Sequence, residues 1–175
     1  MVRSMEESKS LNLLGRTSKW AAAQRARESP RADRLFEDPL AEAMAGEDGF
    51  EMLRRGDEVN PQSKKTADLL AVRTRFFDDL IIRSVSDGIR QVVILAAGLD
   101  CRVFRLDLPT ETEFYELDQK PVIEMKEQVL LSKDARTKCR RVALPVDLRE
   151  NWVEGLWKAG FRTAPSIWIM EGLLY

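Results

Sequence analysis

The apolar positions of this chain change their spacing about halfway along it. Between residues 64 and 86 they recur every three or four positions, which predicts one long helix. A shorter helix is expected over residues 18–28, which are rich in alanine and arginine, and another from Asp38, acting as N-cap ahead of Pro39. Residues 46–63 hold three glycines, a proline and many charges, so they are expected to form a loop.

Beyond residue 90, short apolar runs alternate with helical patterns. Strands are expected over residues 91–96, 113–117, 141–145 and 166–170, with helices over 121–131 and 151–159. Continuous apolar strands that alternate with helices indicate a parallel sheet covered on both faces. The predicted fold is α/β, with a Rossmann-like, doubly wound, mainly parallel sheet in residues 87–175. A helical segment in residues 1–86 is expected to pack on that sheet.

Few residues follow the last predicted strand. A complete sheet of this class continues with further strands and helices, so we expect the chain to be the N-terminal portion of a larger architecture. Its last strand would then be an exposed edge, which invites pairing with another chain. A homodimer through this edge is one expectation, and a truncated, non-catalytic relative is an alternative to an active enzyme.

Composition and charge narrow the function classes. The 28 basic and 29 acidic residues nearly balance, which gives no sign of a nucleic-acid partner. No apolar run reaches the roughly 18 residues of a membrane span, and the first 15 residues lack a secretory core, so a cytoplasmic location is expected. The chain contains no histidine, and Cys101 and Cys139 have no metal-ligand spacing. A Ser-His-Asp triad is excluded, and no metal is expected.

The segment from Gln91 to Asp100 carries the candidate chemistry. A strand runs into a small-residue turn at Gly98, and Asp118 follows twenty residues later (118 − 98 = 20). In dinucleotide folds an acid near that offset accepts hydrogen bonds from ribose hydroxyls. A single glycine and the nearby Asp100 suit pyrophosphate poorly, which leaves a nicotinamide-dependent oxidoreductase as a weaker alternative. A cationic, phosphate-free nucleoside such as S-adenosyl-L-methionine fits better.

Five motifs in a fixed order resemble a known family. They are R-T-R-F-F-D-D from Arg73, Q-V-V-I-L-A-A-G-L-D-C-R from Gln91, E-L-D from Glu116, P-V-D-L-R from Pro145 and E-G-L-L-Y from Glu171. From about Thr17 onward the chain resembles the S-adenosylmethionine-dependent leucine carboxyl methyltransferase family, and especially its bacterial O-methyltransferase branch. The resemblance implies methylation of a carboxylate or hydroxyl on a small molecule or peptide.

The resemblance implies cofactor contacts along the carboxyl edge of the sheet. Gly98 belongs to the turn beneath the methionine part, and Asp118 binds the ribose. Asp147 and Leu148 frame the adenine, with Asp147 accepting a hydrogen bond from the exocyclic amine. A plainer alternative for Asp147 is the N-cap of the next helix.

Three further residues match family positions near the cofactor. Arg73 would hold the cofactor's carboxylate, while Lys19 and Glu171 would lie close to the ligand. Plainer alternatives are a solvated helix lysine for Lys19, an ion pair with the aspartate at position 68, 78 or 79 for Arg73, and a solvated strand-end acid for Glu171. The tryptophans at 152, 157 and 168 are expected to pack rather than stack on a substrate.

Two residues depart from the family pattern L-G-A-G-L-D-T-R. Ala96 stands at the first glycine, where its methyl group would crowd the cofactor or force a small shift. Cys101 replaces threonine and loses a good hydroxyl donor. A carboxylate acceptor is already ionised at pH 7 and needs no general base, so no catalytic residue is assigned. The arginines at 73, 75 and 102 are candidates for orienting such an acceptor.

Overall fold

The computed structural model describes residues 2–60 and 62–172 and falls into two compact units, residues 1–75 and 76–175. The boundary lies within α3 (Ser63–Ser86), the long helix that the apolar spacing predicts. The sequence-based division at residue 86 stays a prediction. The last three residues of the E-G-L-L-Y motif lie outside the described part of the chain.

The first unit begins with α1 (Val2–Glu28), which contains the helix predicted over residues 18–28. It ends just before Ser29-Pro30, because a residue that precedes proline resists helical geometry. Ala22 and Ala23 near its C-terminus are fully buried. Small side chains at these positions allow close packing around this part of the helix.

The second helix, α2 (Ala41–Val59), differs from the prediction in two ways. It begins after Leu40, so Asp38 is not its N-cap; the buried carboxylate of Asp38 instead pairs with Arg25 at 2.8 Å. The helix also occupies most of the span predicted as a loop. Gly46, with a φ of 56° and a ψ of −174°, is not helical, so two helical stretches meet there at a kink. Glycine costs a helix only about 1 kcal/mol relative to alanine, so buried apolar residues on α2 can outweigh it.

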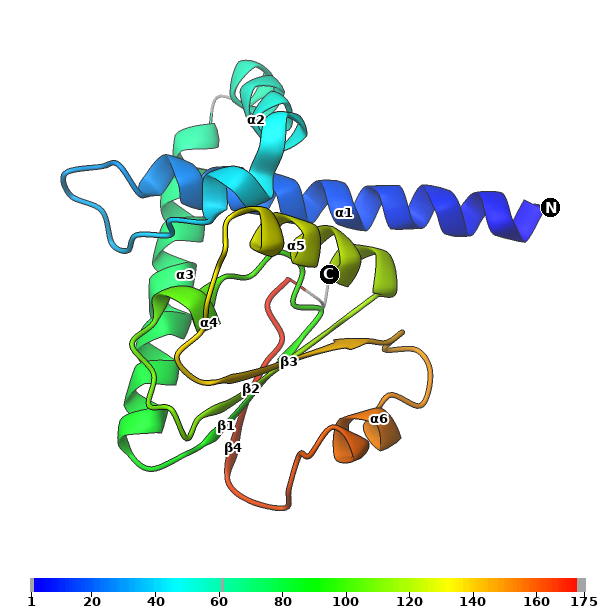
Figure 1. Ribbon diagram of the computed structural model, residues 1–175. Coiled ribbons are helices and arrows are strands. Elements are labelled where there is room, and N and C mark those ends of the chain that lie inside the picture. The colour runs from blue at the N-terminus through cyan, green and yellow to red at the C-terminus, as the bar shows by residue number, and fades with distance from the viewer. Residues whose placement is uncertain (1, 61, 173–175) are drawn as a thin grey trace. The chain divides into compact units, whose positions relative to one another are not determined.

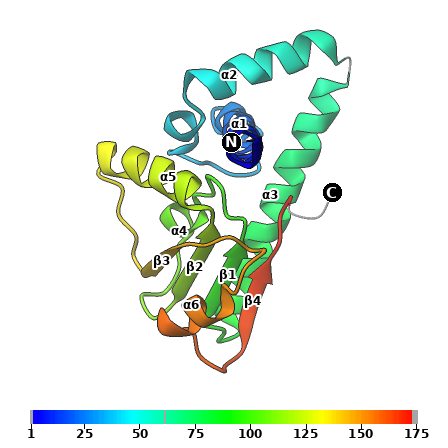
Figure 2. The same cartoon turned by 90° about the vertical axis from the view of Figure 1, so that its right-hand side faces the viewer.

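The second unit contains a four-stranded, all-parallel sheet in the order β3-β2-β1-β4 (Figure 1 and Figure 2). Its strands are β1 (Gln91–Leu95), β2 (Glu113–Asp118), β3 (Arg140–Pro145) and β4 (Ser166–Ile169). The sheet confirms the predicted fold class. Strand order reverses beside β1, since β2 and β3 lie on one side of it and β4 on the other. In such sheets ligands bind at the carboxyl ends of the strands near the reversal.

Different helices cover the two faces of the sheet, because side chains alternate along each strand. Phe114 faces one core cluster, which includes Ile81 of α3. The adjacent Tyr115 faces the other cluster, which includes Leu156 of α6. The helices that follow β1, β2 and β3 are α4 (Arg102–Arg105), α5 (Lys120–Ser132) and α6 (Val153–Lys158).

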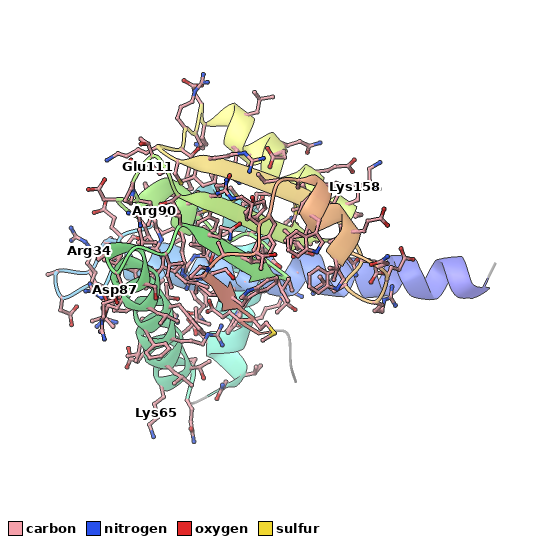
Figure 3. All side chains as sticks on the ribbon, turned by 90° about the horizontal axis from the view of Figure 1, so that it is seen from below. Arg34, Lys65, Asp87, Arg90, Glu111 and Lys158 are labelled. Atoms are coloured by element: carbon pink, nitrogen blue, oxygen red, sulfur yellow. The ribbon has the colours of Figure 1, made fainter. Side chains whose placement is uncertain are left out.

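The amino-terminal edge of the sheet carries polar residues with structural roles. Arg90 and Glu111, labelled in Figure 3, lie just before β1 and β2. The guanidinium of Arg90 donates a hydrogen bond of 2.7 Å to the carbonyl of Val85 near the end of α3. This contact satisfies a carbonyl near the end of α3, which gives Arg90 a structural role. Among the described residues, no helix combines the length and apolarity that crossing a bilayer requires.

Candidate functional site

Asp118 joins the carboxyl ends of three strands. Its Oδ2 accepts a hydrogen bond of 2.6 Å from the backbone N–H of Gly98, and its Oδ1 accepts one of 2.7 Å from Gln119. Its backbone carbonyl accepts another, of 2.8 Å, from Val146 after β3. Each carboxylate oxygen keeps acceptor capacity beyond one N–H bond, so Asp118 can still accept hydrogen bonds from the hydroxyls of a ligand.

The environment of Asp118 sets its charge. Burial raises the pKa of its carboxyl above the ordinary value of 3.8, and the N–H groups of Gly98 and Gln119 partly offset this effect. Both N–H groups need an acceptor, which the ionised carboxylate supplies on each oxygen. The geometry therefore favours a charged Asp118 even though burial opposes it.

The turn after β1 has two residues in the left-handed region. Gly98 and Ala96 both have a φ of 52°, and the N–H of Ala97 bonds to the carbonyl of Leu117 at 3.0 Å. Glycine adopts this conformation freely, whereas an L-residue with a Cβ loses about 1–2 kcal/mol in it. Ala96 therefore has a backbone cost that the sequence reasoning missed. The crowding of a ligand by its methyl group stays a prediction.

Cys101, which stands at the family's threonine position, is buried and keeps a weak contact. Its Sγ lies 3.5 Å from the carbonyl oxygen of Leu99. A thiol is a weaker donor than a hydroxyl, so this contact stabilises the turn less than a threonine bond would.

Arg102 is the centre of a buried ion-pair cluster across the strand-order reversal. Its guanidinium pairs with Asp100 in the same turn, with Asp78 of α3 at 2.8 Å and with Glu171 after β4 at 2.9 Å. Asp78 also pairs with Arg105 at 2.7 Å. Burial alone would lower the pKa of Arg102, but the carboxylates around it outweigh burial and raise it. The cluster fixes the segments after β1 and β4 relative to each other.

This cluster corrects two sequence-based expectations. Arg102 has only 2% of its surface exposed and three carboxylate partners, so it is not placed to orient a substrate carboxylate. Glu171 is not a solvated strand-end acid, since its side chain is 16% exposed and paired with Arg102. Its contact with a cofactor stays a prediction.

Asp147 lies at the same edge of the sheet, after β3. Its carboxylate accepts hydrogen bonds of 2.9 Å from the backbone N–H and from Nε of Arg149. Its pKa is lowered to about 2, first by the Arg149 side chain and then by that N–H. The alternative of a helix N-cap is wrong, because α6 begins at Val153 with Trp152 before it. The next residue, Leu148, packs against the core on the α6 face.

Lys19 and Arg73 belong to the first unit. The Lys19 ammonium lies 2.5 Å from the Asp48 carboxylate and lowers the pKa of that group. Lys19 is therefore an ion-paired residue rather than a solvated helix lysine. Arg73 is half-buried on α3, and its contact with the cofactor carboxylate stays a prediction. The guanidinium of Arg75 donates to the carbonyl of Leu35 at 3.0 Å, which gives Arg75 a structural contact.

The sequence reasoning missed two buried charged groups, the Arg102 cluster and a pair between Glu116 and Lys126. Glu116 and Lys126 have 0% of their surface exposed, and their charged atoms lie 2.6 Å apart. The signal for this pair was a glutamate inside the buried strand segment F-Y-E-L, since a buried carboxylate requires a cation.

The tryptophans pack with other rings, as expected. Phe161 contacts both Trp157 and Trp168, with ring centroids 5.3 and 5.4 Å apart, and Trp152 lies 6.3 Å from Trp168.

Across residues 2–60 and 62–172, no group of three or more potential acidic, histidine or cysteine ligands is placed to hold a metal ion. The carboxyl edge therefore offers carboxylates and backbone N–H groups as its chemistry.

Comparisons with known proteins agree with this arrangement. The model of the family described as leucine carboxyl methyltransferase matches residues 18–175. A protein of Saccharopolyspora erythraea named "Putative S-adenosyl-L-methionine-dependent methyltransferase" is 43% identical over 164 residues, which cover 92% of this chain and 57% of the relative. Similarly named proteins of Parafrankia sp. and Mycolicibacterium gilvum are 42% and 41% identical, over 92% and 99% of this chain and 54% and 61% of theirs. The chain thus spans somewhat more than half the length of these relatives.

Proposed function

Since the chain belongs to the leucine carboxyl methyltransferase family, we propose that it binds S-adenosyl-L-methionine at the carboxyl edge of its sheet and acts in O-methylation. The observation that carries the proposal is the position of Asp118, hydrogen-bonded at 2.6 Å to the Gly98 turn beside the strand-order reversal. An acid at this position suits ribose hydroxyls. The turn lacks the glycines that a pyrophosphate would require.

The neighbouring residues have complementary roles in this proposal. Asp118 accepts from the ribose, and Gly98 lets the backbone approach the methionine part closely. Asp147 accepts from the adenine amine, and Leu148 packs beside the ring. Glu171, held by Arg102, lies near the cationic end of the ligand. Lys19 and Arg73 stay proposed cofactor contacts on the family relationship alone.

The proposed reaction is a displacement at the cofactor's methyl carbon. An acceptor oxygen forms a bond to that carbon while the carbon–sulfur bond breaks, and the sulfonium becomes a neutral thioether. A carboxylate acceptor attacks without losing a proton, whereas a hydroxyl acceptor must lose one. We therefore propose a carboxylate or hydroxyl of a small molecule or peptide as the acceptor, in a cytoplasmic setting. The protein's main contribution is to hold the two reacting atoms in line.

Isothermal titration calorimetry of the purified chain tests this proposal. S-adenosyl-L-methionine and its demethylated product should each bind with measurable heat, and NADH should not. Absence of heat at millimolar concentrations of both adenosyl ligands would contradict cofactor binding by this chain. Binding of NADH alone would instead support an oxidoreductase.

Self-association is a second proposal, supported by the β4 edge. β4 pairs with β1, and within the described residues no strand pairs with its other side. Trp168 and Met170 beside this edge are 40% and 51% exposed. An open strand edge with apolar side chains favours pairing with a second copy. Sedimentation should show a dimer that Met170→Lys weakens, and a monomer at every concentration would contradict it.

A further inference from the structure

The buried pair between Glu116 of β2 and Lys126 of α5 lies next to Asp118 in the strand. The Lys126 ammonium contacts Oε2 of Glu116 at 2.6 Å, and both residues have no exposed surface. The Arg141 guanidinium of β3 donates to the same oxygen at 2.8 and 3.1 Å. Glu116 Oε2 thus accepts three hydrogen bonds from two cations.

This arrangement is not optimal for stability alone. Within the described part of the chain, the other oxygen of Glu116, Oε1, is buried without a hydrogen-bond donor. A buried ion pair is often replaced by apolar residues without loss of stability, because desolvating two charges costs about as much as their attraction returns. The presence of this pair therefore calls for an additional explanation.

Its position relative to Asp118 supplies one. Side chains two residues apart on a strand lie on the same face, about 7 Å from each other, so Glu116 and Asp118 face the same way. A buried carboxylate and a half-buried one at that separation disfavour each other's ionisation. A cation on Glu116 offsets this repulsion. Lys126 supplies one from α5, which begins two residues after Asp118, in addition to the one from Arg141.

The other charged groups around Asp118 are already paired. On β3, Arg141 bonds to Glu116 and to Glu127 at 2.7 Å. The turn after β1 presents the backbone N–H of Gly98. Other charged groups described at this edge include the Arg102 cluster with Asp78, Asp100 and Glu171, and the Asp147–Arg149 pair. The charges that act on Asp118 most directly are therefore Lys126, which lowers its pKa, and Glu116, which raises it.

We propose that Lys126 is a positioning residue of the cofactor site: its buried ammonium, paired with Glu116, keeps Asp118 ionised so that it can hold both the Gly98 turn and the ribose. The role in ribose binding rests on the proposed function. The effect of Lys126 on the charge of Asp118 is independent of the proposed function, because it follows from the contacts between β2 and α5.

Carbon NMR of the Asp118 carboxyl, followed as a function of pH without ligand, tests this proposal. In Lys126→Met the titration midpoint should rise, since Glu116, then paired with Arg141 but not with Lys126, opposes the ionisation of Asp118 more strongly. In Glu116→Gln it should fall. In the double variant Glu116→Gln/Lys126→Met, which removes both charges, it should return near the wild-type value. Lys138→Met removes an exposed lysine paired with Asp107 and should leave the midpoint unchanged.

If a single variant does not fold, the double variant keeps the proposal falsifiable, because it leaves no unpaired buried charge of this pair and its Asp118 midpoint must lie near the wild-type value. An Asp118 midpoint that moves in neither Glu116→Gln nor Lys126→Met overturns the proposal. Titration with S-adenosylhomocysteine then distinguishes the effect of Lys126 on the charge of Asp118 from the role of Asp118 in ribose binding. A shifted midpoint with ligand binding that is lost at a correspondingly shifted pH supports both, whereas a shifted midpoint with no ligand binding by the wild-type chain contradicts the proposed function only.

Discussion

The guanidinium of Arg102 lies 2.9 Å from the carboxylate of Glu171, and this contact joins the segments after β1 and β4 across the strand-order reversal. The segments that follow β1 and β4, two strands that are neighbours in the sheet but distant in sequence, are thus linked by one buried cation. Glu171 belongs to the proposed cofactor set, so Arg102 orients a site residue without being exposed itself.

Arg102→Met should destabilise the chain by about 3–5 kcal/mol. The substitution removes a buried cation shared by three carboxylates, and a buried charge that loses its partner is costly. Arg136→Met is the matched control, because Arg136 pairs with Asp134 at the surface and should change stability by about 0.5 kcal/mol or less. Urea unfolding measures both, and equal effects would show that the cluster adds no stability of its own.

Ala96→Gly should stabilise the chain by about 0.5–1 kcal/mol. It relieves the left-handed strain at Ala96, although glycine returns some entropy to the unfolded state. The melting temperature should rise by about 2 °C. Ala97→Gly, at a buried position without positive φ, should instead lower stability by about 1 kcal/mol. A lower melting temperature for Ala96→Gly would contradict the strained turn.

Gly49→Ala should destabilise the first unit by about 1–3 kcal/mol. A Cβ at this position of α2 would lie 2.6 Å from the backbone carbonyl oxygen of Lys19 on α1, so the helices would have to move apart. Gly56→Ala in the same helix meets no atom within 4 Å and should stabilise by about 0.5–1 kcal/mol. Opposite signs in thermal unfolding support the close packing of α1 and α2, and the same sign in both contradicts it.

Affinity for S-adenosylhomocysteine should fall on acidification because of Asp118 rather than Asp147. The pKa of Asp118 is raised above 3.8, so its carboxylate is protonated first as the pH falls, while Asp147 stays ionised to about pH 2. Contacts that need ionised Asp118 are present above its raised pKa and lost below it. Calorimetry between pH 4 and 7 should show this loss. Persistence of the same pH profile in Asp118→Asn would assign it to another group.

Asp118→Asn should weaken cofactor binding about 10- to 100-fold at pH 7. The amide removes a charged acceptor from the ribose and presents one oxygen where two accept backbone N–H bonds, a loss of about 1.5–3 kcal/mol. Asp107→Asn, at an exposed acid, should leave the dissociation constant unchanged. Equal affinities for the wild type and Asp118→Asn would remove Asp118 from the site.

The sequence predicted the elements whose signal is local. The apolar spacing predicted α3, and the apolar runs predicted all four strands to within about a residue or two. It failed for α2, because a helix that contains Gly46 and Gly49 depends on close packing against α1, which no local pattern records. The family relationship was also recognisable, because it rests on motifs with a fixed order.

The side-chain clusters could be predicted less well. Arg102 pairs with Asp78, 24 residues earlier, and with Glu171, 69 residues later (171 − 102 = 69), and no periodic signal connects such positions. The offset between Gly98 and Asp118 was visible, and the structure joins them by a hydrogen bond. The left-handed φ of Ala96 was hidden because alanine rarely adopts it.

A crystal structure of the chain with S-adenosylhomocysteine tests the central claim most directly. The account predicts the ribose hydroxyls within hydrogen-bond distance of the Asp118 carboxylate, and the adenine amine beside Asp147. A ligand bound at another edge of the sheet, or at this edge with its ribose turned away from Asp118, would contradict it.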